Sequence, residues 1–231
     1  QLFTLMILFV VIGLPLYLLL LLYYNPEATI KITSSLAYFN ALFEDLILSK
    51  RVRKQLISFF PDIKGKKVLE YGAGVGTLTK HLASAVGEGG MVLATDISEK
   101  NLSLLRKKMQ KEEIHHVKAI LDEHQFSRIH PNVENVEIIF SVGMLSYIQD
   151  LEHVLKDMNR VLPEGGKLLF VEYVDYFWGL IPNPQWLATQ EMIRKTFRNA
   201  GFSVKVRKQT GLFWKYLFVV GIKSKDDVPY I

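Results

Sequence analysis

Residues 68–78, VLEYGAGVGTL, constrain the fold more than any other stretch, because they predict a strand, a tight glycine loop and a helix in direct succession. Aliphatic residues lead into Glu70, glycines follow at alternate positions, and Thr77 begins a helical apolar pattern that runs to Val86. Alternating glycines let the backbone turn sharply and approach a ligand without Cβ clashes, while the free N–H groups at the start of a helix face that ligand. The stretch therefore predicts a binding site for a nucleotide-like cofactor.

Strand and helix patterns alternate along the rest of the chain. Short apolar runs predict further strands at residues 91–94, 117–121, 136–142 and 167–173, and apolar residues at helical spacing predict helices over 99–112, 151–158 and 189–201. Residues 202–207 and 214–222 predict a hairpin that turns at Gly211. We expect an α/β fold with a doubly wound, mostly parallel sheet of seven strands, whose ligand-facing residues lie at the carboxyl ends of the strands.

The glycine loop and a later turn carry a family resemblance. Thr77 stands where the dinucleotide fingerprint has its third glycine, which disfavours a nicotinamide cofactor. With Glu70 before Gly72, Gly74 and Gly76, the loop resembles motif I of the class I S-adenosylmethionine-dependent methyltransferases. Residues 160–166, RVLPEGG, are similar to that family's turn into the fifth strand. The resemblance spans residues 34–223 and implies the family's Rossmann-like fold, with an antiparallel last strand.

The resemblance also implies a cofactor, S-adenosyl-L-methionine, and a set of residues that bind it. Glu70 would contact the amino group of the cofactor, directly or through water, and Asp122 its adenine amino group. Asp96 ends the second strand 20 residues after Gly76, where a carboxylate can accept hydrogen bonds from both ribose hydroxyls. Tyr38 would lie against the cofactor or serve as a core residue. The full candidate set is Tyr38, Glu70, Tyr71, Gly72, Ala73, Gly74, Gly76, Asp96, Ile97, Asp122, Glu123, Ser141, Val142 and Gly143.

Tyr147 is the first candidate for a catalytic residue, because it follows the fourth strand, near the expected position of the methyl group. Methyl transfer from a sulfonium is an in-line displacement, so positioning and exclusion of water can supply much of the acceleration. An acceptor that must lose a proton needs a base, for which Glu172, Asp175 and the histidines are alternatives. A packing role for Tyr147 stays open.

The first 24 residues predict a membrane anchor. Residues 2–24 contain no charged side chain, and a helix of this length covers roughly the 30 Å hydrocarbon core. A signal sequence and an interfacial helix bent at Pro15 are the alternatives. Basic residues follow and predict a single pass with the catalytic domain on the cytoplasmic side; they include Lys31, Lys50, Arg51, Arg53 and Lys54. We therefore divide the chain into an anchor (1–24), a linker with amphipathic helices (25–60) and a catalytic domain (61–231).

Two apolar segments bear on the methyl acceptor. The amphipathic region 34–60 predicts a helix that packs on the sheet, or else a lid or membrane-lying helix beside the active site. Residues 174–187 connect the fifth strand to the next helix and hold two tryptophans, so they form core or line an apolar pocket. Together with the anchor, these segments favour a lipid-like acceptor, as in the quinone-biosynthesis and phospholipid N-methyltransferase branch that the chain most resembles.

Composition and spacing argue against several other classes. The chain has no cysteine, which excludes disulfides and thiolate chemistry, and its histidines lack the spacing of a metal site. The net charge of +5 suits an anionic membrane, and no interleaved basic and aromatic pattern indicates nucleic acid. The alternatives are a membrane-tethered methyltransferase of a small soluble thiol, amine or hydroxyl compound, and a catalytically silent scaffold of the same fold. Nothing in the sequence indicates an oligomeric state.

Overall fold

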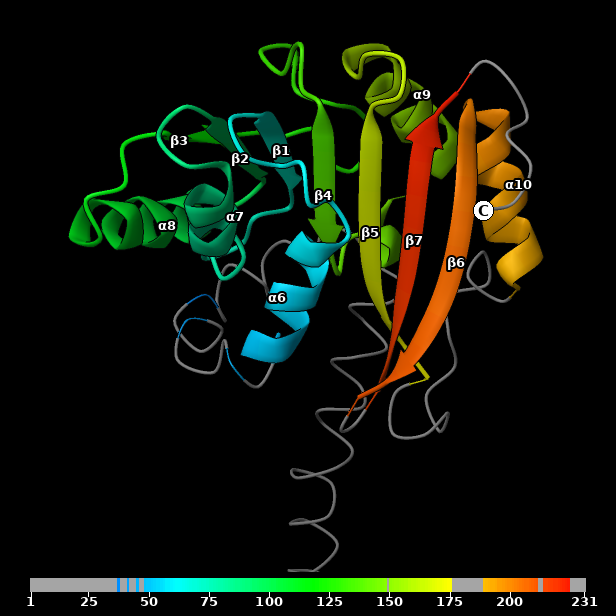
Figure 1. Ribbon diagram of the computed structural model, residues 1–231, viewed down its shortest axis with the longest axis horizontal. Coiled ribbons are helices and arrows are strands. Elements are labelled where there is room, and N and C mark those ends of the chain that lie inside the picture. Colours follow the sequence, from blue (N-terminus) through cyan, green and yellow to red (C-terminus); the bar gives the residue numbers. More distant parts are fainter. Residues whose placement is uncertain are drawn as a thin grey trace, which may run out of the picture.

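One mixed sheet of seven strands, with helices on both faces, forms the centre of the molecule (Figure 1). The computed structural model describes residues 37, 41, 45, 48–148, 150–175, 189–211 and 214–224, with the backbone alone at residue 146. In chain order the elements are α6 (Lys50–Ser58), β1 (Lys67–Tyr71), α7 (Thr79–Val86), β2 (Met91–Asp96), α8 (Glu99–Lys111), β3 (Val117–Leu121), β4 (Ile138–Val142), the 3₁₀ turn η2 (Leu145–Tyr147), α9 (Leu151–Val161), β5 (Lys167–Val174), α10 (Gln190–Asn199), β6 (Phe202–Thr210) and β7 (Lys215–Lys223).

The strand order is β3-β2-β1-β4-β5-β7-β6, and the first five strands in sequence are parallel. β7 lies between β5 and β6 and is antiparallel to both. The predicted doubly wound sheet with an antiparallel last strand is thereby confirmed. The fourth strand starts two residues later than predicted, because the N–H of Val136 donates to the carbonyl of Val161 instead of joining the ladder.

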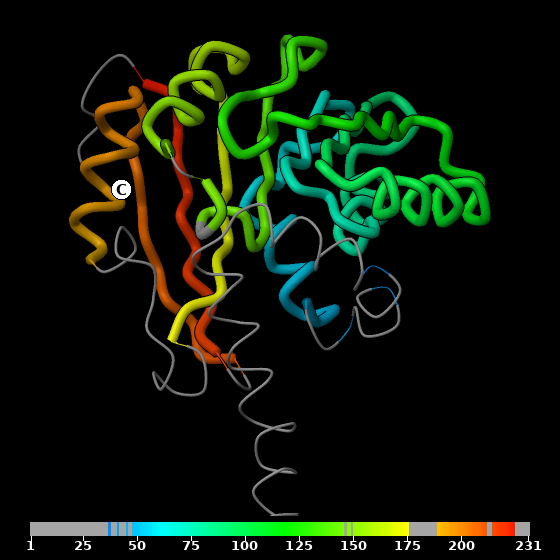
Figure 2. Tube along the Cα trace, turned by 180° about the vertical axis from the view of Figure 1, so that it is seen from behind, coloured from blue at the N-terminus to red at the C-terminus, as the bar shows by residue number. Residues whose placement is uncertain are grey.

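The sheet is buried on both faces, which explains why its strands read as continuous apolar runs. On β2, Val92 packs with α6 and α7, whereas Leu93 joins the core beneath α9 and α10. Figure 1 shows α6 in front of the sheet, and Figure 2, from behind, shows α10 beside β6 and β7. The predicted apolar face of α9 is confirmed, since Leu151, Val154, Leu155 and Met158 are all buried.

The turn into β5 is structural, as expected for the RVLPEGG segment. A Cβ on Gly166 would lie 2.7 Å from the carbonyl oxygen of Pro163, so only glycine fits. The N–H of Gly166 donates to the same carbonyl at 2.9 Å. This turn leads into β5, which pairs with β4.

The helix α6 packs on the sheet, which decides between the two interpretations of this part of the amphipathic region. Val52 and Leu56 are buried in the core formed with Phe140 and Phe218. Arg53, one of the basic residues that follow the predicted anchor, is buried and pairs with Asp45. Its neighbours Lys50 and Arg51 are exposed.

The predicted anchor, residues 1–24, lies outside the described residues. Among the residues that the structure describes, no helix is long and apolar enough to cross a membrane. The anchor therefore stays a prediction.

Candidate cofactor site and active site

The candidate residues gather at the carboxyl ends of β1 to β4. β1 has β2 on one side and β4 on the other, so the chain leaves β1 in one direction and later returns to its opposite side. In open α/β sheets, ligands bind in the crevice at this switch of direction. The glycine loop, Asp96, Asp122 and Gly143 thus lie together at the carboxyl ends of the parallel strands.

The glycine loop is filled by the protein at two of its glycines and is open at the third. A Cβ on Gly72 would meet the side chain of Met144 at 2.4 Å, and one on Gly76 would meet Leu105 at 3.0 Å. At Gly74 no atom lies within 4 Å of the added Cβ, and its φ of +55° is in the left-handed region. A ligand can therefore approach the backbone closely at Gly74.

Glu70 is the penultimate residue of β1, just before this loop, and is buried. The hydroxyl of Thr79, the first residue of α7, donates to its carboxylate at 2.5 Å. Burial raises the pKa of Glu70 to about 8, and the charge of Asp96 adds to this rise while the bond from Thr79 opposes it. A cationic group brought to this carboxyl would favour its ionised form. Sequence reasoning missed Thr79, because a threonine in the first turn of a helix gives no signal of this contact.

Asp96 ends β2 and ties the site together. One carboxylate oxygen accepts the N–H of Gly74 at 2.8 Å, and the other accepts the N–H of Ser98 at 2.9 Å and the side-chain amide of Asn101 at 3.0 Å. Burial raises its pKa and these three hydrogen bonds oppose the rise. A carboxylate has about four acceptor positions, so about one remains for a ligand hydroxyl. Asn101 is a second partner that the sequence did not reveal.

Asp122 follows β3 and lies beside Asp96, whose carbonyl accepts its N–H at 3.0 Å. One carboxylate oxygen accepts the N–H of His124 at 3.1 Å. The other is buried and has no hydrogen-bond partner within the described ranges. Burial raises the pKa of Asp122, and the charge of Asp122 contributes to the raised pKa of the Tyr71 phenol, so the two groups are near one another.

Gln125 adds a further polar group to this corner. Its amide nitrogen donates to the sulfur of Met144 at 3.8 Å, which leaves the amide oxygen as a buried acceptor without a partner in the part of the chain that the structure describes. The phenol oxygen of Tyr71 is also buried and has no hydrogen-bond partner among the described residues. A buried acceptor without a partner costs free energy. The unpaired oxygens of Asp122 and Gln125 therefore suit a ligand amino group that donates two hydrogens. The residues present thus fit an adenine ring, and Gln125 is a candidate that sequence reasoning missed.

The remaining predicted cofactor residues have varied settings. Ser141 is buried, and its hydroxyl donates to the carbonyl of Tyr71 at 2.9 Å, which joins β4 to β1. The N–H of Gly143 donates to Val171, and a Cβ there would lie 3.2 Å from the ring of Tyr173. Ala73 is buried, Ile97 and Val142 are half-buried, and Glu123 is exposed. Tyr38 lies outside the described residues.

Tyr147 and Glu172 lie together on the acceptor side of the site. Burial raises the pKa of Tyr147 to about 12, and the charge of Glu172 adds to the rise. Glu172 is buried on β5, where one carboxylate oxygen accepts the N–H of Tyr173 at 2.9 Å. At neutral pH Tyr147 is therefore a neutral phenol, which suits a hydrogen-bond donor better than the base considered from the sequence. The apolar segment expected beside it lies largely outside the described residues.

Asp175, the other carboxylate considered as a base, is held by two cations. Its oxygen lies 3.0 Å from the ammonium group of Lys215 and 3.5 Å from that of Lys208. A carboxylate in ion pairs is a weaker proton acceptor, because the cations favour its ionised form. Asp175 is therefore a less suitable base than the sequence suggested.

Comparison with known proteins agrees with this geometry. Residues 68–166 match the family model described as a methyltransferase domain. Demethylmenaquinone methyltransferase of Bacillus cereus (strain AH187) is 32% identical over 124 residues, which are 53% of this chain and 51% of that protein. The chain thus spans about half the length of the curated relatives that it matches.

Solved structures share the fold at low identity. A SAM-dependent methyltransferase from Aquifex aeolicus has a TM-score of 0.63 and 20% identity, over 74% of this chain and 89% of that chain. Magnesium protoporphyrin IX methyltransferase from Synechocystis PCC 6803 with bound SAH has a TM-score of 0.62 and 16% identity, over 77% of this chain and 84% of that chain. Residues 68–166 are therefore similar to a methyltransferase domain, and the described part of the chain has the fold of these SAM-dependent methyltransferase structures.

Proposed function

We propose that this protein is a membrane-anchored, S-adenosylmethionine-dependent methyltransferase of a lipid or lipid-like acceptor. The main support for this cofactor is a set of three buried carboxyl groups, Glu70, Asp96 and Asp122. They lie at the carboxyl ends of β1, β2 and β3, near the open backbone at Gly74. The pKa of each is raised by burial. A cofactor that carries a sulfonium and an ammonium group supplies the positive charge that favours their ionised forms.

Each carboxyl group has a separate part in binding this cofactor. Glu70 takes the ammonium group, Asp96 accepts one ribose hydroxyl, and the unpaired oxygens of Asp122 and Gln125 accept the two hydrogens of the adenine amino group. The bound cofactor supplies an electrophilic methyl group. The described residues then position the acceptor and exclude water, with Tyr147 as a donor and Glu172 as the group that takes a proton from the acceptor.

The acceptor is an isoprenoid quinone precursor or a phospholipid head-group amine. Support comes from the similarity to demethylmenaquinone methyltransferase and from the uncharged stretch over residues 2–24, which would hold the domain at the membrane that contains such acceptors. The basic residues after that stretch support a cytoplasmic position for the catalytic domain.

The test is a pair of glycine substitutions. Gly74→Ala places a methyl group in the open loop and should weaken S-adenosylmethionine binding at least about tenfold, measured by calorimetry on the full chain in detergent. Gly65→Ala is the matched control, because Gly65 also has a positive φ of +77° and nothing within 4 Å, but lies before β1 and away from the site. Equal affinities for both variants would contradict the cofactor site.

A labelling assay identifies the acceptor. The protein and S-adenosylmethionine with a labelled methyl group are incubated with a total membrane lipid extract and, separately, with a pool of small soluble compounds. Label in the lipid fraction supports the proposal, and the mass of the product names the acceptor. Label only in the soluble pool would replace the lipid acceptor by a small one. Cofactor binding without any transfer would instead support a silent scaffold.

A further inference from the structure

The net charge of this protein is concentrated in α10 and β6. Residues 190–210 contain six Lys or Arg residues and one acidic residue, a net charge equal to the +5 of the whole chain. The rest of the sequence therefore has equal numbers of basic and acidic residues and no net charge. We name this set the basic edge, and its members are Arg194, Lys195, Arg198, Lys205, Arg207 and Lys208.

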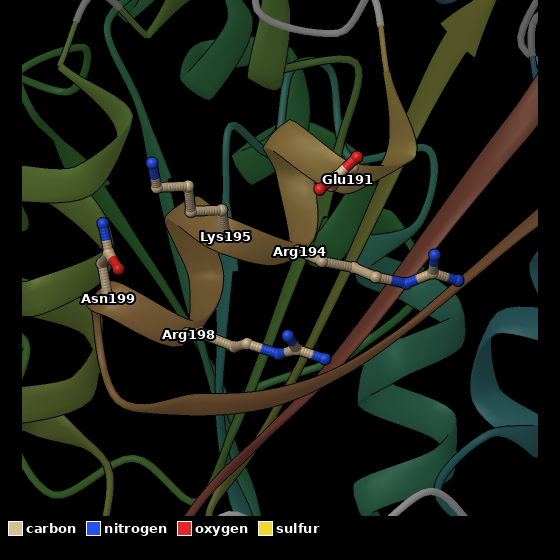
Figure 3. A pocket seen from close by; sticks show the side chains of 5 residues that line it. All are labelled: Glu191, Arg194, Lys195, Arg198 and Asn199. Atoms are coloured by element: carbon tan, nitrogen blue, oxygen red, sulfur yellow. The ribbon is translucent and has the colours of Figure 1, made fainter.

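The basic edge is formed by the helix α10 and by the edge strand β6. β6 is the edge strand, and α10 packs against it (Figure 2). Lys205, Arg207 and Lys208 are exposed on β6. Figure 3 shows Arg194 and Arg198, one turn apart on α10, extending to the same side of the helix.

The α10 part of the basic edge has room for an anion. A pocket of about 390 Å³ is lined by Glu191, Arg194, Lys195, Arg198 and Asn199 (Figure 3). The Nε of Arg194 is buried and lacks a hydrogen-bond partner among the described residues. Guanidinium groups bind phosphate oxygens well, because their N–H groups form a planar fork.

The opposite end of the sheet differs. There Arg106 pairs with Glu99 at 2.5 Å and Lys80 with Glu112 at 2.6 Å. In contrast, Lys195 and Arg207 form no ion pair with any residue within the described ranges. Within the described ranges, Lys195 on α10 and Arg207 on β6 are thus the members of the basic edge that are available to an outside anion, together with the unpaired Nε of Arg194.

The basic edge reaches the end of the sheet where the acceptor side of the site lies. β6 is parallel to β5, because each is antiparallel to the β7 strand between them. Lys208 pairs in register with Leu217, which in turn pairs with Glu172. The strand positions of Lys208 and Glu172 are therefore two strand spacings apart, roughly 10 Å.

We propose that the basic edge docks the catalytic domain onto a membrane surface that contains anionic phospholipid. Lipid phosphates bind Arg194 and Lys195 at the pocket and Arg207 on the strand, which brings the acceptor end of β5 to the bilayer. This inference rests on the proposed action at a membrane and adds an orientation: β6, and not the opposite edge strand β3, faces the lipid head groups.

The experiment uses the absence of cysteine from the chain, which allows a single fluorophore to be placed by one substitution. Full-length Thr210→Cys carries the fluorophore at the exposed end of β6, and Lys118→Cys carries it on β3. Both are reconstituted into vesicles with a head-group nitroxide quencher, made of phosphatidylcholine with or without about one third phosphatidylglycerol. We expect quenching at residue 210 only, and only with phosphatidylglycerol.

Charge variants test the residues themselves. Arg194→Gln with Arg207→Gln should return the quenching at residue 210 to its level in pure phosphatidylcholine, since each cation contributes about fivefold to binding at an anionic surface. The matched control, Lys107→Gln with Lys111→Gln on the exposed face of α8, removes the same charge and should leave the quenching unchanged. Salt near 1 M, where the Debye length is about 3 Å, should abolish the quenching.

Three results would overturn the docking surface: equal quenching at residues 118 and 210, equal loss in the control variant, or preferential binding of an oligonucleotide over the anionic vesicles. Cofactor binding and lipid methylation are measured in the same preparations. If the labelled protein that keeps all its basic residues methylates lipid but shows no quenching at residue 210 on anionic vesicles, the docking surface alone is rejected. Quenching without cofactor binding rejects the proposed function alone.

Discussion

Glu70→Gln separates the stability of this fold from its proposed function, because it keeps the shape of the side chain and removes its charge. A pKa moved from 4.5 to about 8 means that ionised Glu70 costs the folded state roughly 5 kcal/mol in the absence of ligand. The folded state holds the proton more tightly than the unfolded state. The stability of the native protein should therefore be complete below about pH 4.5 and fall by about 1.4 kcal/mol per pH unit up to about pH 8.

Glutamine has no proton to lose, so the variant should lack this part of the pH dependence. Its amide oxygen can still accept the hydroxyl of Thr79, which makes the two proteins similar near pH 5. By pH 8 the variant should be the more stable by about 2–4 kcal/mol, after roughly 1 kcal/mol is deducted for the amide hydrogens that gain no partner. The assay is urea unfolding followed by circular dichroism at intervals from pH 5 to pH 9.

Cofactor binding should move in the opposite direction. In the native protein the affinity for S-adenosylmethionine should rise as pH approaches 8, because the cationic amino group binds the ionised carboxylate. In Glu70→Gln the affinity for S-adenosylmethionine should be weaker. Residue 70 should then add nothing to the change of this affinity with pH. If the unfolding curves of the two proteins run parallel between pH 5 and pH 9, Glu70 is not the buried, protonated group described above.

Two further predictions concern the adenine corner and the acceptor side. Gln125→Leu should lower the affinity for S-adenosylhomocysteine about tenfold but leave that for its N6-dimethyl analogue unchanged, because the analogue has no amino hydrogen to donate; calorimetry with both ligands tests this, and an equal loss for the two would refute it. Tyr147→Phe should reduce kcat by about tenfold or less without moving any ionisation in the pH–rate profile below pH 9, since the phenol titrates only near pH 12; a basic limb that disappears in the variant would show that the phenolate takes part.

The features that the sequence predicted correctly are those set by short-range spacing. A parallel sheet brings the carboxyl ends of its strands together, so Glu70, Asp96 and Asp122 could be grouped before their contacts were seen. The apolar spacing of α9 likewise determined which of its faces is buried.

The partners of these acids could not be predicted, since they depend on how separate elements approach one another. Thr79 and Asn101 lie in the first turns of helices and read as ordinary capping or surface residues, and Gln125 lies in a polar segment. The burial of Arg53 could not be predicted for a similar reason, because it depends on the pairing with Asp45.

The position of β7 has a consequence for biosynthesis. Of the strands that the structure describes, β7 is the last to be synthesised, yet it pairs along its length with both β5 and β6. Until residues 215–223 emerge, a nascent chain would carry two unpaired strand edges, and unpaired edges are templates for aggregation. A premature stop before Lys215 would thus separate β6 from β5 and leave both without a partner on that side, so we expect carboxyl-terminal truncations that reach this strand to be cleared by proteolysis.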